Sequence, residues 1–151
     1  LYKDSDHPDL AQSLNSIATV YISLGDHKKS LEYNLEAHEM RKRIYEGSAY
    51  HPDLAQSLNS IGADYSKLGD FQLSLEYKLN AYEMRKRIYE GSAYHPDLVS
   101  SLNEIGADYS SLGDYKLGFE YVKQAYEMLK KRLHYNSDQS IQAAQFNPWI
   151  I

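Results

Sequence analysis

The tripeptide His-Pro-Asp occurs three times, beginning at His7, His51 and His95, at a constant interval of 44 residues. Histidine is a common metal ligand, so three copies could supply a metal site. Zinc needs its ligands about 2 Å from one shared ion, whereas each helix layer between neighbouring repeats takes about 8–10 Å. This distance argues against a shared ion. Proline followed by aspartate suits a first helical turn, so we expect the tripeptide to open a helix each time.

The same tripeptide also resembles the signature of J-domain co-chaperones, which stimulate a partner ATPase. A J-domain carries one copy, in a loop between two long helices. This chain carries three copies at the repeat period, each at the expected start of a helix. The helix-start interpretation is therefore favoured.

Other catalytic chemistry has little support in the chain. Cysteine is absent, no serine lies in a nucleophile elbow, and no glycine-rich phosphate loop occurs. The carboxylates Asp64 and Asp108 are expected on a solvated helix surface. We predict a protein that is not an enzyme and that has neither a cofactor nor a metal.

The interval that separates the tripeptides also divides the whole chain into like segments. Residues 7–50 and 51–94 are identical at about three-quarters of their positions, and 95–138 form a more diverged third copy. A fixed period of this length predicts a solenoid, in which each unit buries its apolar face against its neighbours. Residues 1–6 are expected to be the end of a preceding repeat or a linker, since Leu1-Tyr2 resembles Ile44-Tyr45. Residues 139–151 are expected to form a capping helix up to Phe146 and an apolar tail.

Each unit has the apolar spacing of two helices. In the middle copy Leu54, Leu58, Ile61, Tyr65 and Leu68 follow one another at steps of four, three, four and three, as on one helix face. Gly69-Asp70 should end this helix, and Gly91 should end a second, more broadly apolar one. The predicted helices are 8–24, 27–46, 52–68, 71–90, 96–112 and 115–134. No strand pattern appears, so the fold class is all-α.

These units resemble tetratricopeptide repeats of the longer, kinesin-light-chain-like type. The resemblance rests on Leu58-x-x-Ile61-Gly62-x-x-Tyr65 before Gly69-Asp70 and on Ala81 in the second helix, with counterparts in the other copies. It implies a right-handed α-solenoid of antiparallel helix pairs whose first helices line a concave groove. The chain departs from the family in its longer period and in the place of one aromatic residue of the second helix, here Tyr33, Tyr77 and Tyr121.

The groove that the resemblance implies gives the candidate binding residues. Asn15, Asn59 and Asn103 recur at the same place in each first helix, and related repeats use such asparagines to hold a peptide backbone. An amide offers one donor and one acceptor group to an extended peptide. Two alternatives stay open: these asparagines keep an exposed helix polar, or they bond to a neighbouring repeat. The full candidate set is Asn15, Asn59, Asn103, Gln12, Gln56, Ser16, Ser60 and Lys67.

The charge pattern limits the class of partner. The net charge of −5 gives no general attraction to nucleic acid or to an anionic membrane. The basic clusters 41–43 and 85–87 are mixed with glutamates and are expected to form a solvated outer face with local ion pairs. Lys67 is the one basic residue expected in the groove, which disfavours a ligand anchored by its carboxylate.

The expected function is therefore a protein-interaction scaffold for a peptide or partner protein. Near-identical repeats favour a ligand that is read through its backbone or is itself repetitive. The alternative is an architectural spacer or a self-assembling array, with a possible homo-oligomer formed through the apolar tail. A cytoplasmic location is expected.

Overall fold

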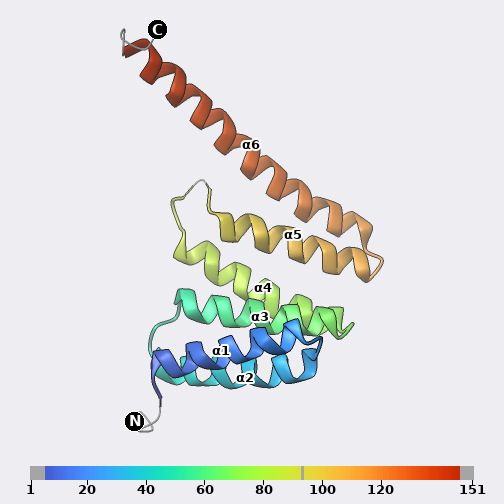
Figure 1. Ribbon diagram of the computed structural model, residues 1–151. Helices are drawn as coiled ribbons and strands as arrows, with labels where there is room; N and C mark the ends of the chain where they lie inside the picture. The colour runs from blue at the N-terminus through green and yellow to red at the C-terminus, as the bar shows by residue number, and fades with distance from the viewer. Residues whose placement is uncertain (1–5, 93, 147–151) are drawn as a thin grey trace.

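The computed structural model describes residues 6–92 and 94–146, and these residues form six helices (Figure 1). The helices are α1 (Pro8–Ser23), α2 (His27–Ile44), α3 (Pro52–Lys67), α4 (Phe71–Ile88), α5 (Pro96–Ser111) and α6 (Tyr115–Phe146). No strand occurs within these ranges. The predicted all-α solenoid is confirmed, and the first five helices end within two residues of their predicted limits.

The His-Pro-Asp tripeptides open α1, α3 and α5. The Nδ1 atom of His51 accepts a hydrogen bond from the amide of Asp53 at 3.2 Å, and Pro52 occupies the first turn, where its missing amide costs nothing. The ring of His51 also stacks on Tyr45, with 3.5 Å between centroids, and the Tyr45 hydroxyl donates to the Asp53 carboxylate at 2.6 Å. Tyr89 repeats both contacts with His95 and Asp97. The tripeptide therefore joins one repeat to the next.

The helices stop at glycines in the left-handed conformation. Gly69 ends α3 with a φ of 84°, and Gly91 follows α4 with the same φ. Residues with a Cβ rarely adopt this conformation, so glycine allows the chain to reverse direction within a few residues.

Within each pair the two helices are joined by a tyrosine stack. Tyr65 of α3 stacks on Tyr77 of α4, with 5.5 Å between ring centroids, and the other pairs have equivalent stacks. The aromatic residue that departs from the family pattern is therefore used for packing inside the pair.

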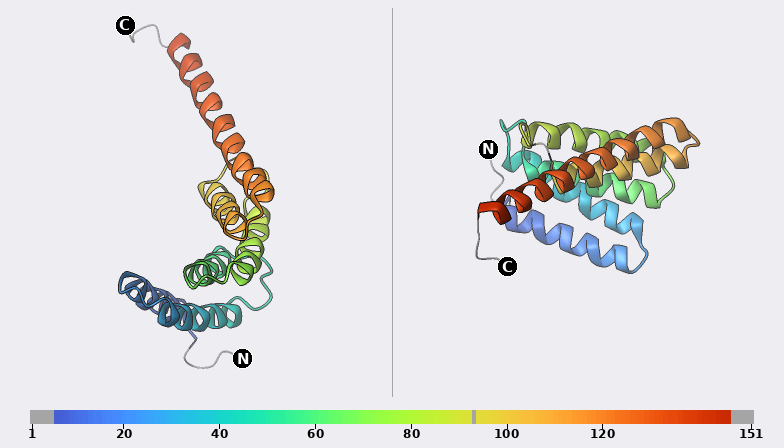
Figure 2. Two further views of the ribbon diagram at one scale, coloured as in Figure 1. Left: turned by 90° about the vertical axis from the view of Figure 1, so that its right-hand side faces the viewer. Right: turned by 90° about the horizontal axis from the view of Figure 1, so that it is seen from above.

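Helices that follow one another in the chain also pack against one another, and the pairs stack into a curved array (Figure 2). The left view of Figure 2 shows α1, α3 and α5 on the inner side of the curve and α2 and α4 on the outer side. This placement agrees with the expectation that the first helix of each pair faces a concave surface.

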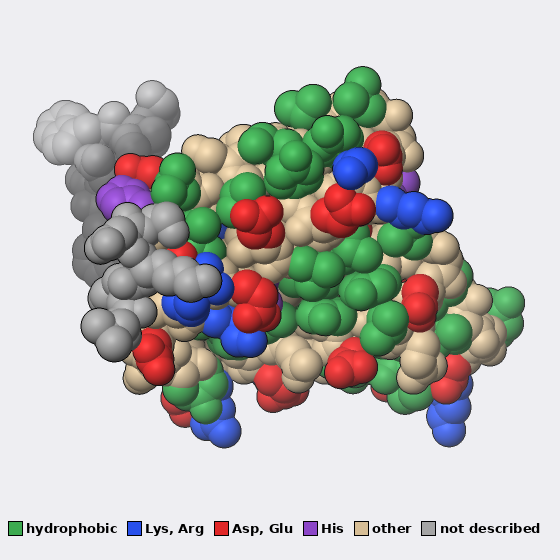
Figure 3. Space-filling view, turned by 90° about the horizontal axis from the view of Figure 1, so that it is seen from below, with side chains coloured by type: hydrophobic (Ala, Val, Ile, Leu, Met, Phe, Trp, Pro, Cys, Tyr) green, Lys and Arg blue, Asp and Glu red, His purple; other side chains and the backbone are tan. Residues whose placement is uncertain are grey.

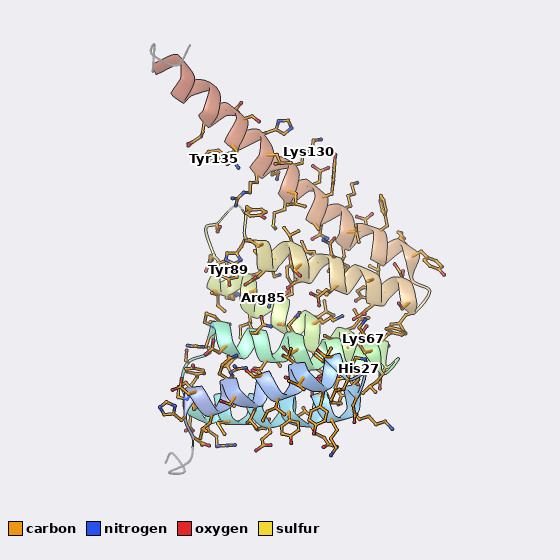
Figure 4. All side chains as sticks on the ribbon, in the orientation of Figure 1. His27, Lys67, Arg85, Tyr89, Lys130 and Tyr135 are labelled. Carbon is orange, nitrogen blue, oxygen red and sulfur yellow. The ribbon has the colours of Figure 1, made fainter. Side chains whose placement is uncertain are left out.

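The C-terminal segment differs from the prediction. Residues 139–146 do not form a separate capping helix; they are the last turns of α6, a helix of 32 residues whose first part packs on α5 and whose C-terminal part projects from the stack. The physical reason is that no glycine or proline interrupts the chain between Gly118 and Phe146, so nothing stops the helix. Tyr135 on this projecting half is 64% exposed (Figure 4). The expectations for Leu1-Tyr2 and for the apolar tail fall on residues 1–5 and 147–151, outside the described residues.

Candidate functional site

A groove of about 440 Å³ lies on the inner side of the array. Nine of its twelve lining residues come from α1 and α3, and α2 and α5 supply the rest. The lining residues are Gln12, Asn15, Thr19, Ile22, Asn34, Arg41, Asp53, Gln56, Asn59, Ser60, Ala63 and Glu104.

Five of the eight candidate residues predicted from the sequence line this groove. They are Gln12, Asn15, Gln56, Asn59 and Ser60. Ser16 lies exposed on α1 and bonds only to the carbonyl of Gln12 in its own helix. Lys67 is exposed at the end of α3, at the opposite end of the helix pairs from Arg85 and Tyr89 (Figure 4). Neither of these two side chains is part of the groove wall.

The three recurring asparagines have three different surroundings. Asn15 donates to the amide oxygen of Asn34 at 2.7 Å, within its own helix pair. Asn59 is buried and donates to Glu104 of the next repeat at 3.3 Å. Asn103 is exposed on α5 and does not line the groove. The structure therefore brings the first two to one cavity and leaves the third outside it.

Two buried polar atoms of the groove wall have no hydrogen-bond partner among the described residues. They are the Oδ1 atom of Asn59, an acceptor, and the Nη1 atom of Arg41, a donor. The other terminal nitrogen of Arg41 donates to Gln12 at 3.2 Å. Each of these two atoms has almost no accessible surface, so a ligand in the groove reaches either one only after a side chain changes its rotamer.

The electrostatics of the groove are mixed. Arg41 is 4% exposed, and this burial lowers its pKa, while the nearby carboxylate of Asp53 acts in the opposite direction. Glu104 lies 3.9 Å from the ammonium group of Lys78. The groove thus contains both signs of charge, which favours a polar ligand over a strongly charged one.

Asp64 and Asp108 are a correction to the sequence interpretation. Both were expected on a solvated surface, but they are 1% and 2% exposed and lie between repeats. Asp64 accepts hydrogen bonds from Ser30 and Asn34 of α2, and Asp108 accepts them from Ser74 and Lys78 of α4. Their position was a usable signal, because Asp64 follows Ile61 by three residues and precedes Leu68 by four, on the apolar stripe.

The basic clusters are a second correction, in part. Arg41 and Arg85 are buried instead of solvated, and Arg85 donates to Ser101 at 2.7 Å and to Gln56 at 3.0 Å. Lys42 and Lys86 do make the expected exposed ion pairs, with the glutamates three residues before them. The buried arginines recur four residues after Ala37 and Ala81, again on the buried stripe, and this spacing could have identified them.

Residues 6–92 and 94–146 contain no group of three histidine, cysteine or carboxylate side chains placed to hold a metal ion. None of the helices in these ranges has the length and hydropathy needed to span a bilayer.

Stacked antiparallel helix pairs with a groove on the side of the first helices define a helical-repeat solenoid. Sequence profiles of the tetratricopeptide repeat match residues 10–53 and 53–131. The chain therefore belongs to the tetratricopeptide repeat family, as its residue pattern predicted. Comparison with curated protein sequences gives no match.

Solved structures with the same fold include kinesin-light-chain-like proteins. BtubC (BKLC) from P. vanneervenii is 23% identical, with a TM-score of 0.76 over 84% of this chain and 49% of its own. A putative kinesin light chain from Podosopora anserina with nearly identical TPR-like repeats is 18% identical, with a TM-score of 0.73 over 84% of this chain and 58% of its own. The complex of the yeast Sti1 TPR2AB domain with pHSP90 is 17% identical, with a TM-score of 0.61 over 94% of this chain and 53% of its own. The chain spans about half the length of these proteins.

Proposed function

We propose that this chain is a non-catalytic protein-interaction scaffold that binds an extended peptide segment of a partner in the groove lined by α1, α3 and α5. The observation that carries the proposal is the groove itself, whose wall gathers amide and hydroxyl side chains of two neighbouring first helices: Gln12, Asn15, Gln56, Asn59 and Ser60. An extended peptide presents C=O and N–H groups along its backbone and can bond to such side chains.

The surrounding side chains support a ligand that is recognised through its backbone. Gln12, Gln56 and Ser60 add amide and hydroxyl groups to the wall, while Ile22 and Ala63 add apolar surface. Lys67 lies away from the groove, and the one basic residue of the wall, Arg41, is buried and bonded to Gln12, which disfavours a ligand anchored by its carboxylate. The solved complex of the yeast Sti1 TPR2AB domain with pHSP90 is a further support, since it shows a protein of this fold with a partner.

The test begins with peptides selected from a random phage-display library on the immobilised 151-residue chain. Binding of one selected peptide is then measured by calorimetry for the wild type and for Asn59→Ala and Asn103→Ala. We expect Asn59→Ala to weaken binding about tenfold, the effect of one or two lost hydrogen bonds. Asn103→Ala makes the same change at the equivalent position outside the groove and should leave the affinity unchanged.

A second pair of variants separates loss of binding from loss of structure. Ala63→Arg places a long side chain in the groove without removing a hydrogen bond, and Ala107→Arg does the same at the exposed equivalent position on α5. Ala63→Arg should abolish peptide binding, and Ala107→Arg should not. The two variants should have the same circular dichroism spectrum and the same melting temperature. Equal binding by the two arginine variants would overturn the proposal, as would a library that yields no peptide.

A further inference from the structure

Helices α1 and α6 each pack against one other helix, whereas α2 to α5 each pack against two, within the part of the chain that the structure describes. The uncovered face of α1 is apolar: Leu10, Ile17 and Val20 are 49%, 41% and 59% exposed. Their counterparts on α3, which does have a neighbour on this side, are all 8% exposed or less. Figure 3 shows hydrophobic side chains gathered on the α1–α2 end of the array.

The two interfaces between repeats are polar at fixed positions of the outer helices. Ser30 and Asn34 of α2 bond to Asp64 of α3, and Ser74 and Lys78 of α4 bond to Asp108 of α5. Further along each outer helix is a buried arginine, Arg41 or Arg85. After these come Tyr45 and Tyr89, which reach the histidine and aspartate of the next helix start.

At each of these four positions, counted by the repeat period of 44 residues, α6 has a residue without a polar side chain. The serine position is Gly118, the next is Val122, the arginine position is Leu129 and the tyrosine position is Leu133. Val122, Leu129 and Leu133 are 44%, 38% and 66% exposed. The change is matched on α1, where Val20 stands at the position of Asp64 and Asp108. Polar residues therefore meet polar residues at both internal interfaces, and the two uncovered faces carry apolar residues at the same sites.

We propose that copies of this chain associate end to end, with α1 of one copy packed on the outer face of α6 of another. In this contact α1 lies on α6 in the same alignment as α3 lies on α2 and α5 lies on α4. This alignment places Val20 against Val122. A partner helix with an aspartate at the position of Val20 would bury an unpaired carboxylate there, whereas a second copy of this chain buries two valines. Because the two surfaces are different, the contact is heterologous, and each added copy presents an uncovered α1 face at one end and an uncovered α6 face at the other.

End-to-end packing also has a consequence for the inner surface of the array. In this alignment α1 of the second copy takes the place beside α5 of the first copy that α3 has beside α1 within one copy. The concave surface therefore continues from one copy to the next. The association uses no residue of the groove wall, and it stands or falls independently of peptide binding.

The test is the mass of the 151-residue chain in solution, measured by sedimentation velocity across a wide range of concentration. The wild type should form oligomers whose mean mass keeps rising with concentration. Val20→Asp and Val122→Lys should each weaken the association about tenfold or more, since each buries an unpaired charge against a valine. The double variant should regain most of it, because the new pair reproduces Asp108 and Lys78, whose charged atoms are 2.8 Å apart.

Matched controls make the outcome decisive. Gln124→Lys adds the same charge on the opposite side of α6, two residues after Val122, and should leave the association unchanged. Val20 is already more than half exposed, so Val20→Asp should keep the wild-type melting temperature and peptide binding. A chain that stays monomeric at all concentrations would overturn the proposal. Oligomers that persist in both single variants, or that vanish on removal of residues 147–151, would also overturn it.

Discussion

Among single residues, Asp64 and Asp108 occupy the same place in successive repeats but have different partners. Burial raises the pKa of Asp64, and the hydrogen bonds from Asn34 and Ser30 act against this rise. Asp108 instead faces a buried ammonium group, that of Lys78, at 2.8 Å. The aspartate at this position therefore accepts hydrogen bonds from neutral side chains in one interface and forms an ion pair in the other.

This difference predicts unequal costs for the same substitution. Asp108→Asn leaves the charge of Lys78 buried without a full partner, and we expect the free energy of unfolding to fall by about 3–5 kcal/mol. Asp64→Asn keeps an acceptor for neutral donors and should cost about 1–2 kcal/mol. Urea denaturation of both variants measures the difference. Equal losses would show that the Lys78 pair does not matter. Asn103→Ala, at an exposed position of the helix that carries Asp108, serves as the control.

The tyrosine that ends each outer helix predicts a pH dependence. Burial, together with the carboxylate of Asp53, raises the pKa of Tyr45 from 10.0 to about 12, and Tyr89 shifts in the same direction. Below pH 10 the hydroxyl is protonated in both the folded and the unfolded chain. Between pH 10 and 12 the unfolded chain releases this proton first, so the stabilisation is lost as the pH rises.

The measurement compares urea midpoints at pH 9 and at pH 11. The wild type should lose stability between the two values, and Tyr45→Phe should be less stable at pH 9 but lose less on the way to pH 11. Tyr115→Phe, at a position that is 73% exposed, should follow the wild type at both values. An identical pH response of the Tyr45 and Tyr115 variants would show that the loss of stability does not come from the Tyr45 hydroxyl.

At the scale of the helices, the sequence predicts where elements begin and end better than it predicts what faces what. The His-Pro-Asp starts and glycine stops are local signals, because each depends on the conformation of a few residues. The spacing of Arg41 and Arg85 from the alanines four residues earlier indicates their burial, but their hydrogen-bond partners lie on other helices, and no local signal predicts those. The length of α6 was missed because the repeat period suggested a junction near Ser137, where no residue stops a helix.

Close packing inside the last helix pair gives a prediction at the same scale. A Cβ added to Gly106 would lie 2.9 Å from the carbonyl oxygen of Gly118 and 2.7 Å from a methyl group of Val122. Gly106→Ala should therefore lower the free energy of unfolding by about 1–3 kcal/mol, the usual cost of overpacking. A Cβ on Gly62 would meet the Cγ atom of Lys78 at 2.7 Å and the carbonyl oxygen of Ser74 at 3.1 Å, so the backbone contact is looser and Gly62→Ala should cost less. Urea denaturation that ranks the two variants in the reverse order would contradict the packing.

For the whole molecule, near-identical units predict stacking because each unit contacts only its neighbours. The repeat period, with the residue pattern of the family, was enough to predict a solenoid with a groove on its inner side. It was not enough to predict that equivalent residues differ in surroundings. Asn59 is covered by α5 and bonded to Glu104, whereas Asn103 faces solvent on α5 itself, with only α6 following it in the stack.

The same architecture predicts an uneven distribution of stability. Helices α3 and α4 pack against two neighbours each, while the half of α6 beyond Leu133 stands away from the stack. Hydrogen exchange followed by mass spectrometry should show the slowest exchange in α3 and α4 and the fastest helical exchange in residues 134–146. Uniform exchange over all six helices would instead indicate one cooperative unit.

The central claim is that the inner groove binds a peptide, and NMR tests it most directly. A selected peptide is titrated into the isotope-labelled chain while the side-chain amides of Gln12, Asn15, Gln56 and Asn59 are followed. We predict that these four signals shift together and saturate at the affinity measured by calorimetry, while the amide of Asn103 stays in place. Shifts confined to α6 or to the outer faces of α2 and α4 would contradict the claim.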